Sequence, residues 1–110
     1  MGAMRADVLR GHLDTLLLAV LADASGHGYE LGRRLTERSG GELGVPEGSL
    51  YPALHRLERA GLVDSAWSAS SGRRRRTYRL TAAGRRAAAA QRQEWRAFSA
   101  AVDKVLGAAT

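Results

Sequence analysis

One short polar turn in an otherwise helical sequence sets the strongest limit on how this chain can fold. Residues 68–72 read Ser-Ala-Ser-Ser-Gly and separate two short runs, 62–67 and 75–80, in which apolar and polar side chains alternate. Alternation with a period of two is typical of β-strands, and a Ser/Gly-rich segment between two such runs predicts a hairpin. The side chains expected to face the rest of the fold are Val63, Ser65 and Trp67 on one strand and Arg76, Tyr78 and Leu80 on the other.

Helices are predicted before this hairpin. Residues 8–22 carry apolar side chains with a period near 3.6, and residues 28–39 place Leu31 and Leu35 inward before two glycines end the helix. Both patterns are typical of helices that pack on one side against a core. The apolar stripe of the first helix consists of Leu9, Leu13, Leu16, Leu17, Val20 and Leu21.

A third helix is expected to begin at Ser49 as its N-cap. Pro52 then falls in the first turn, where its missing N–H is not needed, and Gly61 supplies the left-handed residue after the helix. Three leucines of this helix gather on one side. The other side and its flank carry Ser49, Tyr51, Pro52, His55, Arg56 and Arg59.

The last helix is expected over residues 82–106, with Thr81 as its N-cap. A helix of this length spans about 37 Å, which is longer than a small domain can cover with its own core. Its sparse apolar stripe therefore predicts a partner, most simply the same helix of a second copy. The stripe consists of Ala88, Trp95, Phe98, Val102, Val105 and Leu106.

Composition limits the class of protein. The chain has 110 residues, 45% of them hydrophobic, which fits one folded domain. It has no cysteine, its three histidines are not spaced as metal ligands, and no nucleophile or acid–base motif is present. We therefore expect no enzyme, no metal and no cofactor. The longest apolar patch, residues 16–22, is too short to cross a bilayer and no secretory signal is recognisable, so a cytoplasmic location is expected.

Positive charge is concentrated in the middle of the chain. The net charge is +6, and residues 33–86 contain twelve arginines and five acidic residues. Four of the arginines are consecutive, at positions 73–76, and follow the predicted turn directly. Such an excess of positive charge indicates a polyanionic partner. The alternative that the arginine run leaves open is a basic surface that contacts only water.

Three helices, a hairpin and a terminal helix form, in this order, a winged helix-turn-helix. The predicted fold class is therefore mainly α (α+β), with a long C-terminal dimerisation helix. In this fold the third helix enters the major groove of DNA, where arginine can bridge O6 and N7 of guanine, and the hairpin, or wing, follows phosphates or reaches into the minor groove. The DNA contacts expected outside the third helix are Gly72, Arg73, Arg74, Arg75 and Arg76 on the wing, and Tyr29 and Arg33 on the second helix.

The domain boundaries follow from these elements. Residues 1–7 form an N-terminal extension, in which residues 1–3 resemble an expression scar because a second methionine, Met4, follows them. Residues 8–81 form the DNA-binding domain, and residues 82–110 form the dimerisation helix and a tail.

Four segments in this order resemble the PadR-type transcriptional regulators of bacteria, in their small class with a single C-terminal helix. They are HGYEL at 27–31, GSLYPALHRLERAGLV at 48–63, Trp67, and LTAAG at 80–84, and the similarity covers nearly everything after Arg10. The resemblance implies a DNA-binding homodimer, usually a repressor, that pairs through its C-terminal helix. It also implies that Ser49, Tyr51, Pro52 and Arg56 belong to the DNA-reading helix and that Gly72, Arg73 and Arg75 belong to the wing.

Apart from an arginine in place of a lysine at position 76, the wing departs from the family pattern in two places. The family usually has Gly-Arg-Pro-Arg-Lys-Tyr-Tyr, whereas this chain has Gly-Arg-Arg-Arg-Arg-Thr-Tyr, so Arg74 replaces a proline and Thr77 a tyrosine. A more cationic and less rigid wing tip is expected. Whether Arg74 contacts a phosphate or the minor groove stays open.

Trp95 has two interpretations. It is either an aromatic side chain of a dimer core or, with Phe98 and Val102, a wall of an effector pocket in which it stacks on a planar aromatic ligand. The function predicted from the whole sequence is a ligand-responsive repressor that binds a pseudo-palindromic operator as a homodimer. The alternatives are a small-molecule sensor or sequestering protein, and a basic winged-helix module for RNA or another protein.

Overall fold

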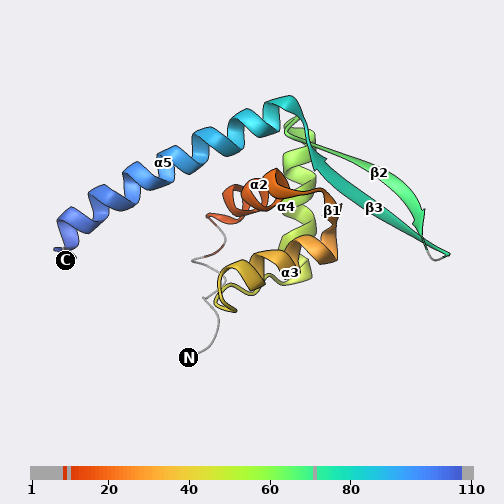
Figure 1. The fold of residues 1–110 in the computed structure, drawn as a ribbon, viewed down its shortest axis with the longest axis horizontal. Coiled ribbons are helices and arrows are strands. Elements are labelled where there is room, and N and C mark those ends of the chain that lie inside the picture. Colours follow the sequence, from red (N-terminus) through yellow and green to blue (C-terminus); the bar gives the residue numbers. More distant parts are fainter. Residues whose placement is uncertain (1–8, 10, 71, 108–110) are drawn as a thin grey trace.

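The computed structural model describes residues 9, 11–70 and 72–107, and Figure 1 shows their arrangement. The predicted fold class is confirmed: a helical bundle carries a small antiparallel sheet and continues into one long helix. The predicted extension, residues 1–7, and the last three residues of the tail lie outside the described residues. The elements in chain order are α2 (Leu13–Asp23), β1 (Gly26–His27), α3 (Gly28–Arg38), α4 (Glu47–Arg59), β2 (Val63–Ser70), β3 (Arg73–Leu80) and α5 (Ala82–Leu106).

The core lies where α2, α3 and α4 meet the sheet. Leucines from all three helices are completely buried there, and Val63, Tyr78 and Leu80 close it from the hairpin. The hairpin face predicted from alternation is confirmed at its base, where Val63 pairs with Leu80 and Ser65 with Tyr78. Figure 1 shows that the wing and α5 leave this core in opposite directions.

The first predicted helix is shorter than expected. It was predicted from residue 8, but α2 begins at Leu13, because Gly11 and His12 form a turn in which the His12 N–H donates to the Leu9 carbonyl at 2.9 Å. Glycine costs conformational entropy inside a helix, so the helical pattern breaks at Gly11 although its apolar stripe continues. Leu9 is nevertheless buried in the core.

The start of α4 also corrects the sequence prediction. The N-cap is Pro46, not Ser49, and the N–H groups of Ser49 and Leu50 donate to the Pro46 carbonyl. Proline fixes φ near −65°, which here prepares the chain to enter the helix. Pro52 consequently lies beyond the first turn, where its ring leaves the Gly48 carbonyl without an i+4 donor.

The end of α4 agrees with the prediction. Gly61 has a φ of +78°, its N–H donates to the Glu58 carbonyl, and the N–H of Leu62 donates to the Leu57 carbonyl, each at 3.0 Å. This pair of bonds is a Schellman motif, which satisfies the last carbonyls of the helix and turns the chain directly into β2.

The sheet is larger than the predicted hairpin. The two long strands extend to Ser70 and Arg73, so the turn has only two residues, and Gly72 occupies it with a φ of +75°. Arg73 and Arg74, which precede the predicted strand 75–80, therefore belong to β3. A third strand, β1, pairs with β3 through Gly26 and Tyr78, which gives the order β1-β3-β2. The sequence analysis treated this segment only as a break between helices.

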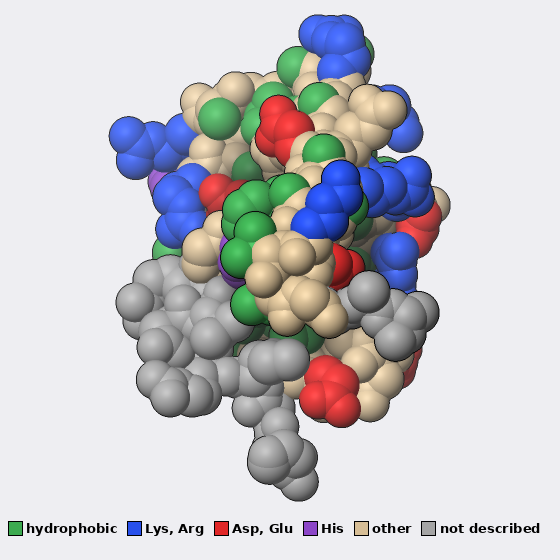
Figure 2. All heavy atoms as spheres, turned by 90° about the vertical axis from the view of Figure 1, so that its left-hand side faces the viewer, with side chains coloured by type: hydrophobic (Ala, Val, Ile, Leu, Met, Phe, Trp, Pro, Cys, Tyr) green, Lys and Arg blue, Asp and Glu red, His purple; other side chains and the backbone are tan. Residues whose placement is uncertain are grey.

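Helix α5 is capped as predicted. The Thr81 hydroxyl accepts from the Gly84 N–H at 3.0 Å, and Gly107 ends the helix in the left-handed conformation. Near its start α5 packs on α2, where the Thr15 hydroxyl donates to the Gln91 side-chain carbonyl at 2.7 Å. Figure 2 looks toward the far end of this helix and shows hydrophobic side chains near the middle of the face, with basic side chains on both sides. The large apolar side chains of α5 that remain exposed are Trp95, Phe98, Val105 and Leu106.

Candidate nucleic-acid interface

A groove of about 700 Å³ runs between α4, the start of α3 and the wing. We call it the wing groove. Its walls are His27, Gly28 and Tyr29 from the junction of β1 and α3, Tyr51 from α4, and Trp67, Arg73–Arg76 and Tyr78 from the wing. The groove therefore joins aromatic rings and arginines that are far apart in the sequence.

The exposed side of α4 is divided into three parts. Pro52, His55 and Arg59 form its outermost face, and His55 and Arg59 line a smaller hollow next to the wing groove. Tyr51 lies on the flank toward the wing, where it borders both hollows. Arg56 lies on the other flank, and its Nη2 atom is 2.9 Å from Oδ1 of Asp14 on α2. Ser49 is exposed in the first turn.

Tyr51 is held close to the backbone of α3. Gly28 is buried under the phenol ring, so that a Cβ atom at this position would stand 2.5 Å from Cε1 of Tyr51. Only glycine leaves room for the ring in this orientation. Beside it, burial raises the pKa of the Tyr78 phenol, which keeps this group neutral in the wall of the groove.

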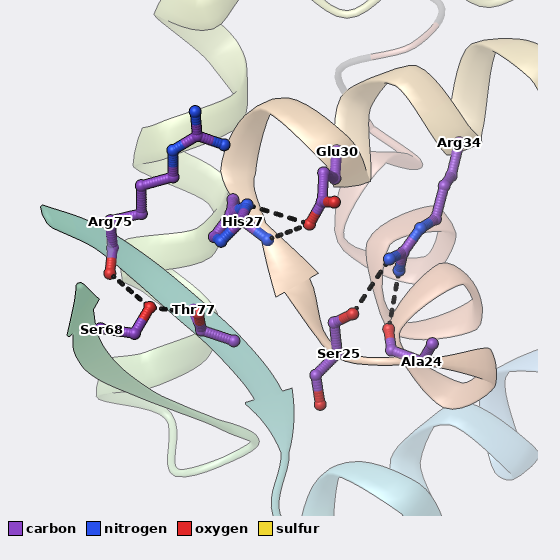
Figure 3. Close-up of polar contacts among 8 residues, drawn as sticks. All are labelled: Ala24, Ser25, His27, Glu30, Arg34, Ser68, Arg75 and Thr77. Carbon is purple, nitrogen blue, oxygen red and sulfur yellow. Dashed lines mark hydrogen bonds and ion pairs between the residues drawn. The ribbon is translucent and has the colours of Figure 1, made fainter. Parts of the chain in front are cut away.

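The start of α3 is fixed by polar contacts that Figure 3 shows. The His27 N–H donates to Oε1 of Glu30 at 2.9 Å, and the same oxygen is 3.1 Å from the His27 Nδ1 atom. Arg34 donates to the carbonyls of Ala24 and Ser25, which holds the loop between α2 and β1. The hydrogen bond from the His27 backbone lowers the pKa of Glu30 below its usual range, so this carboxylate stays charged at the helix N-terminus.

The two proposed contacts on α3 differ in position. Tyr29 is two-thirds exposed and lines the wing groove. Arg33 lies one turn further along, with its guanidinium 6.0 Å from the Tyr29 ring and its Nε 3.8 Å from Glu37. Of the two, only Tyr29 borders the groove.

The wing carries its arginines on two faces. Arg74 and Arg76 share the face of Trp67, with their guanidinium carbons 4.7 Å and 5.1 Å from the centre of the indole. Arg76 is partly buried: its Nε donates to the Ser65 hydroxyl at 2.8 Å, and its Nη2 is 3.7 Å from Glu58 on α4. Arg73 and Arg75 lie on the opposite face. Figure 3 shows the Arg75 carbonyl accepting from Ser68, while its side chain projects away from the strand.

The basic residues are therefore not equally available to a ligand. Arg34, Arg38, Arg56 and Arg76 hold parts of the protein together through carbonyl or carboxylate partners. Within the described ranges, no carboxylate lies within ion-pair distance of Arg59 or of the wing arginines 73–75. These four charges border the wing groove or the hollow beside it.

A second, more apolar hollow lies between α2 and α5. It is lined by Trp95 and Phe98 from α5 and by His12 and Leu16 from the α2 side, and the His12 ring meets the Trp95 ring edge-on at 5.3 Å. Trp95 and Phe98, grouped in the sequence analysis, are thus brought together. Val102 lies one turn further along α5 and is not part of this lining.

Two participants, Asp14 and Glu58, escaped the sequence analysis, and a third, Ser65, was placed on the inward strand face without a predicted partner. All three bind arginines of the candidate interface. Asp14 and Glu58 lie on other elements than their arginine partners, and their spacing along the chain carries no signal. Trp67 was expected from its alternation with Ser65 to face the rest of the fold and was part of the family pattern, but it is exposed, and its contacts with arginines were not predicted. No cluster of three potential metal ligands occurs among the residues that the structure describes, and no helix there is long and apolar enough to span a bilayer.

The fold and the groove define a DNA-binding regulator of the winged helix-turn-helix class. The PadR-like family of transcriptional regulators matches residues 17–90. The chain belongs to this family, whose members are transcriptional regulators and not enzymes.

Individual relatives agree with this assignment. A transcriptional regulator of Mycobacterium tuberculosis is 42% identical over 86 residues, which cover 78% of this chain and 75% of the relative. A PadR family transcription regulator of Clostridium difficile is 34% identical, with a TM-score of 0.78 over 87% of this chain and 99% of its own. A transcriptional regulator of Clostridium thermocellum is 29% identical, with a TM-score of 0.81 over 90% and 97% of the two chains.

Proposed function

We propose that this protein is a ligand-responsive repressor that binds a pseudo-palindromic operator as a homodimer in the cytoplasm. The observation that carries the proposal is the wing groove, where the exposed side of α4 meets wing arginines that have no carboxylate partner in the described structure. Helix α4 reads base edges in the major groove, and the wing binds phosphates. Residues 8–81 then form the DNA-binding domain, and residues 82–110 form the dimerisation helix and tail.

The residues proposed to contact DNA have separate roles. Tyr51, His55 and Arg59, together with Ser49 and Pro52, form the surface that approaches the bases. On the wing, Arg73, Arg74 and Arg75 bind the DNA backbone, and Gly72 shapes the turn. On α3, Tyr29 and Arg33 bind DNA phosphates. Arg56 can reach DNA only after it leaves Asp14, because the two side chains form an ion pair in the free protein. Arg76 approaches a phosphate from its anchored position at Ser65 and Glu58.

Dimerisation through α5 is supported by its exposed apolar side chains. Phe98, Val105 and Leu106 are more than half exposed and lie in the second half of α5, after Gln91, which contacts Thr15 of α2. Burying this stripe against the same stripe of a second copy would remove it from water and place two α4 helices about 34 Å apart, one turn of DNA. Phe98→Glu should convert the dimer to a monomer in analytical ultracentrifugation, whereas the exposed Lys104→Glu should leave it unchanged.

The response to a ligand is supported by the apolar hollow and by its connection to α4. Two neighbouring residues of α2 connect α5 with α4: Thr15 binds Gln91 on α5, and Asp14 binds Arg56 on α4. A planar aromatic molecule beside Trp95 can therefore shift α4 if it prefers one position of α5 over another. Trp95 fluorescence, titrated with planar aromatic compounds in a Trp67→Phe background, tests the binding step.

Footprinting on DNA upstream of the protein's own gene, with and without such ligands, tests the proposal as a whole. We expect a protected site with two-fold symmetry and an affinity that falls steeply with salt. Arg74→Ala should weaken binding to all sequences and reduce the salt slope by about one, whereas Arg56→Ala should relax the preference at one base position. An affinity that does not depend on salt would contradict DNA binding.

Binding experiments with planar compounds and nucleic acids distinguish the proposed repressor from two other functions. The apolar hollow favours a small-molecule sensor or sequestering protein, which would bind planar compounds without any change in its affinity for DNA. A basic winged-helix module for RNA or for a protein would prefer structured RNA, or neither nucleic acid, in competition at physiological salt.

A further inference from the structure

We propose that Trp67 is a positioning residue for DNA binding: its indole ring holds the Arg74 side chain at the wing groove so that the guanidinium is prepared to bind a phosphate. The inference rests on the proposed DNA-binding function and adds a residue to which neither the family pattern nor the sequence analysis assigned a role in DNA binding.

Trp67 is unusual in its exposure. More than half of its surface, 56%, is accessible, and it lies on a strand outside the buried core. A tryptophan that contributed only core packing would be buried. Its neighbours instead are cations: Arg76 is its cross-strand partner, and Arg74 lies two residues before Arg76 on the same face. Both guanidinium groups are within the range of a cation–π contact.

The two arginines are not equivalent. Arg76 is fixed to α4, because its guanidinium contacts both Ser65 and Glu58, and the Ser65 hydroxyl donates to the same Glu58 carboxylate at 2.6 Å. This chain of contacts fixes the base of the wing next to α4. Arg74 has no carboxylate within ion-pair distance in the described part of the chain, so its contact with the aromatic ring leaves its charge available.

The contact with the ring has a physical consequence for binding. A free arginine side chain loses conformational freedom when it binds a phosphate, and part of this loss is avoided when the side chain is already held by a rigid ring. Arg73 and Arg75, on the other face of β3, have no such contact with Trp67. Arg74 should therefore contribute more to affinity than either neighbour, although all three carry the same charge.

A double-mutant cycle tests the proposal. The variants are Trp67→Leu, which keeps apolar bulk and removes the ring, Trp67→Phe, which keeps a smaller ring, and Arg74→Ala. Affinity is measured by fluorescence anisotropy on a labelled duplex of arbitrary sequence, because phosphate contacts do not depend on sequence. Trp67→Leu should weaken binding about fivefold in the native background and less than about twofold in the Arg74→Ala background. Trp67→Phe should retain most of the affinity.

Arg59→Ala provides the matched control, since Arg59 lies on α4 and the wing is unchanged. Trp67→Leu should weaken binding by the same factor with or without Arg59. Equal losses with and without Arg74, or no loss from Trp67→Leu at all, would overturn the positioning role. Circular dichroism and urea unfolding of each variant identify a loss that comes from unfolding.

One measurement does not need DNA. In the free protein the ring current of Trp67 should shift the Arg74 δ-methylene proton resonances upfield, and the shift should disappear in Trp67→Leu. Absence of the shift in the native protein would overturn the proposed contact. If the native protein fails to bind any duplex, both the proposed function and the positioning role are contradicted. If it binds DNA but the effects of Trp67→Leu and Arg74→Ala are additive, only the positioning role is contradicted.

Discussion

Asp14 on α2 and Arg56 on α4 form an ion pair across the surface of the helical bundle, with Oδ1 and Nη2 2.9 Å apart. Both side chains are about half exposed, so the pair contributes little to stability, about 0–1 kcal/mol. Its importance lies in its position, because it holds an arginine of the proposed DNA-reading helix against another element.

Asp14→Asn should therefore strengthen DNA binding, by up to about tenfold at low salt, because it frees Arg56 and removes a negative charge near the DNA. The gain is measured on the footprinted site. In an Arg56→Ala background the substitution should retain only the smaller effect of the removed charge. Weaker binding by Asp14→Asn would show instead that the ion pair holds Arg56 in its binding position.

Gly28 controls the orientation of Tyr51. A methyl group at this position would meet the end of the phenol ring, which can rotate away, so Gly28→Ala should leave the fold intact and displace Tyr51 from the groove. We expect affinity for DNA to fall about tenfold, as for one lost contact of about 1.4 kcal/mol. Gly32→Ala, where the nearest atom is an ordinary 3.4 Å away, is the control and should bind as the native protein does.

Gly84 fixes the start of α5 against the end of α4. A Cβ atom here would overlap the backbone carbonyl oxygen of Leu62, which cannot move as a side chain would. Gly84→Ala should lower the free energy of unfolding by about 1–3 kcal/mol in urea. Gly48→Ala, in α4 with open space around it, should be neutral or slightly stabilising. Equal unfolding midpoints for native protein and Gly84→Ala would contradict this close contact.

Glu30 should make stability depend on pH on the acidic side. Its pKa in the folded protein is lowered from the ordinary value of 4.5, first by the hydrogen bond from the His27 backbone. The charged form is therefore favoured by folding, so its contribution is complete above pH 4.5 and is lost as the pH falls through the lowered pKa. Glu30→Gln should be less stable than the native protein at neutral pH, with a difference that shrinks in acid. Glu37→Gln, on the exposed side of the same helix, should show little change at either pH.

Much of the fold follows from patterns that act over a few residues. The Schellman motif at Gly61, the cap at Thr81 and the alternation that places Val63 and Tyr78 inward are all decided within one turn or one strand. The prediction was wrong where two local rules applied to the same segment, at the start of α4. Ser49 is a good N-cap residue, but Pro46 fixes the backbone three residues earlier, and α4 starts there.

The candidate site, like the fold, was predictable from the sequence only in part. Its basic character, its wing and the exposed side of α4 were predictable, because charge and periodicity are properties of the sequence itself. The availability of each arginine was not, since that depends on partners distant in the chain: Asp14 for Arg56 and Glu58 for Arg76.

The sequence by itself thus determined the order of the main helices and the two hairpin strands, the caps at Gly61 and Thr81, and the presence of a basic hairpin after the third helix. Only the tertiary structure decided that β1 joins the sheet, that Gly28 lies beneath Tyr51 and that Trp67 stands beside Arg74. The physical reason is that propensity, capping and periodicity act between near neighbours, whereas these contacts form when packing of the leucine core brings separate elements to fixed positions.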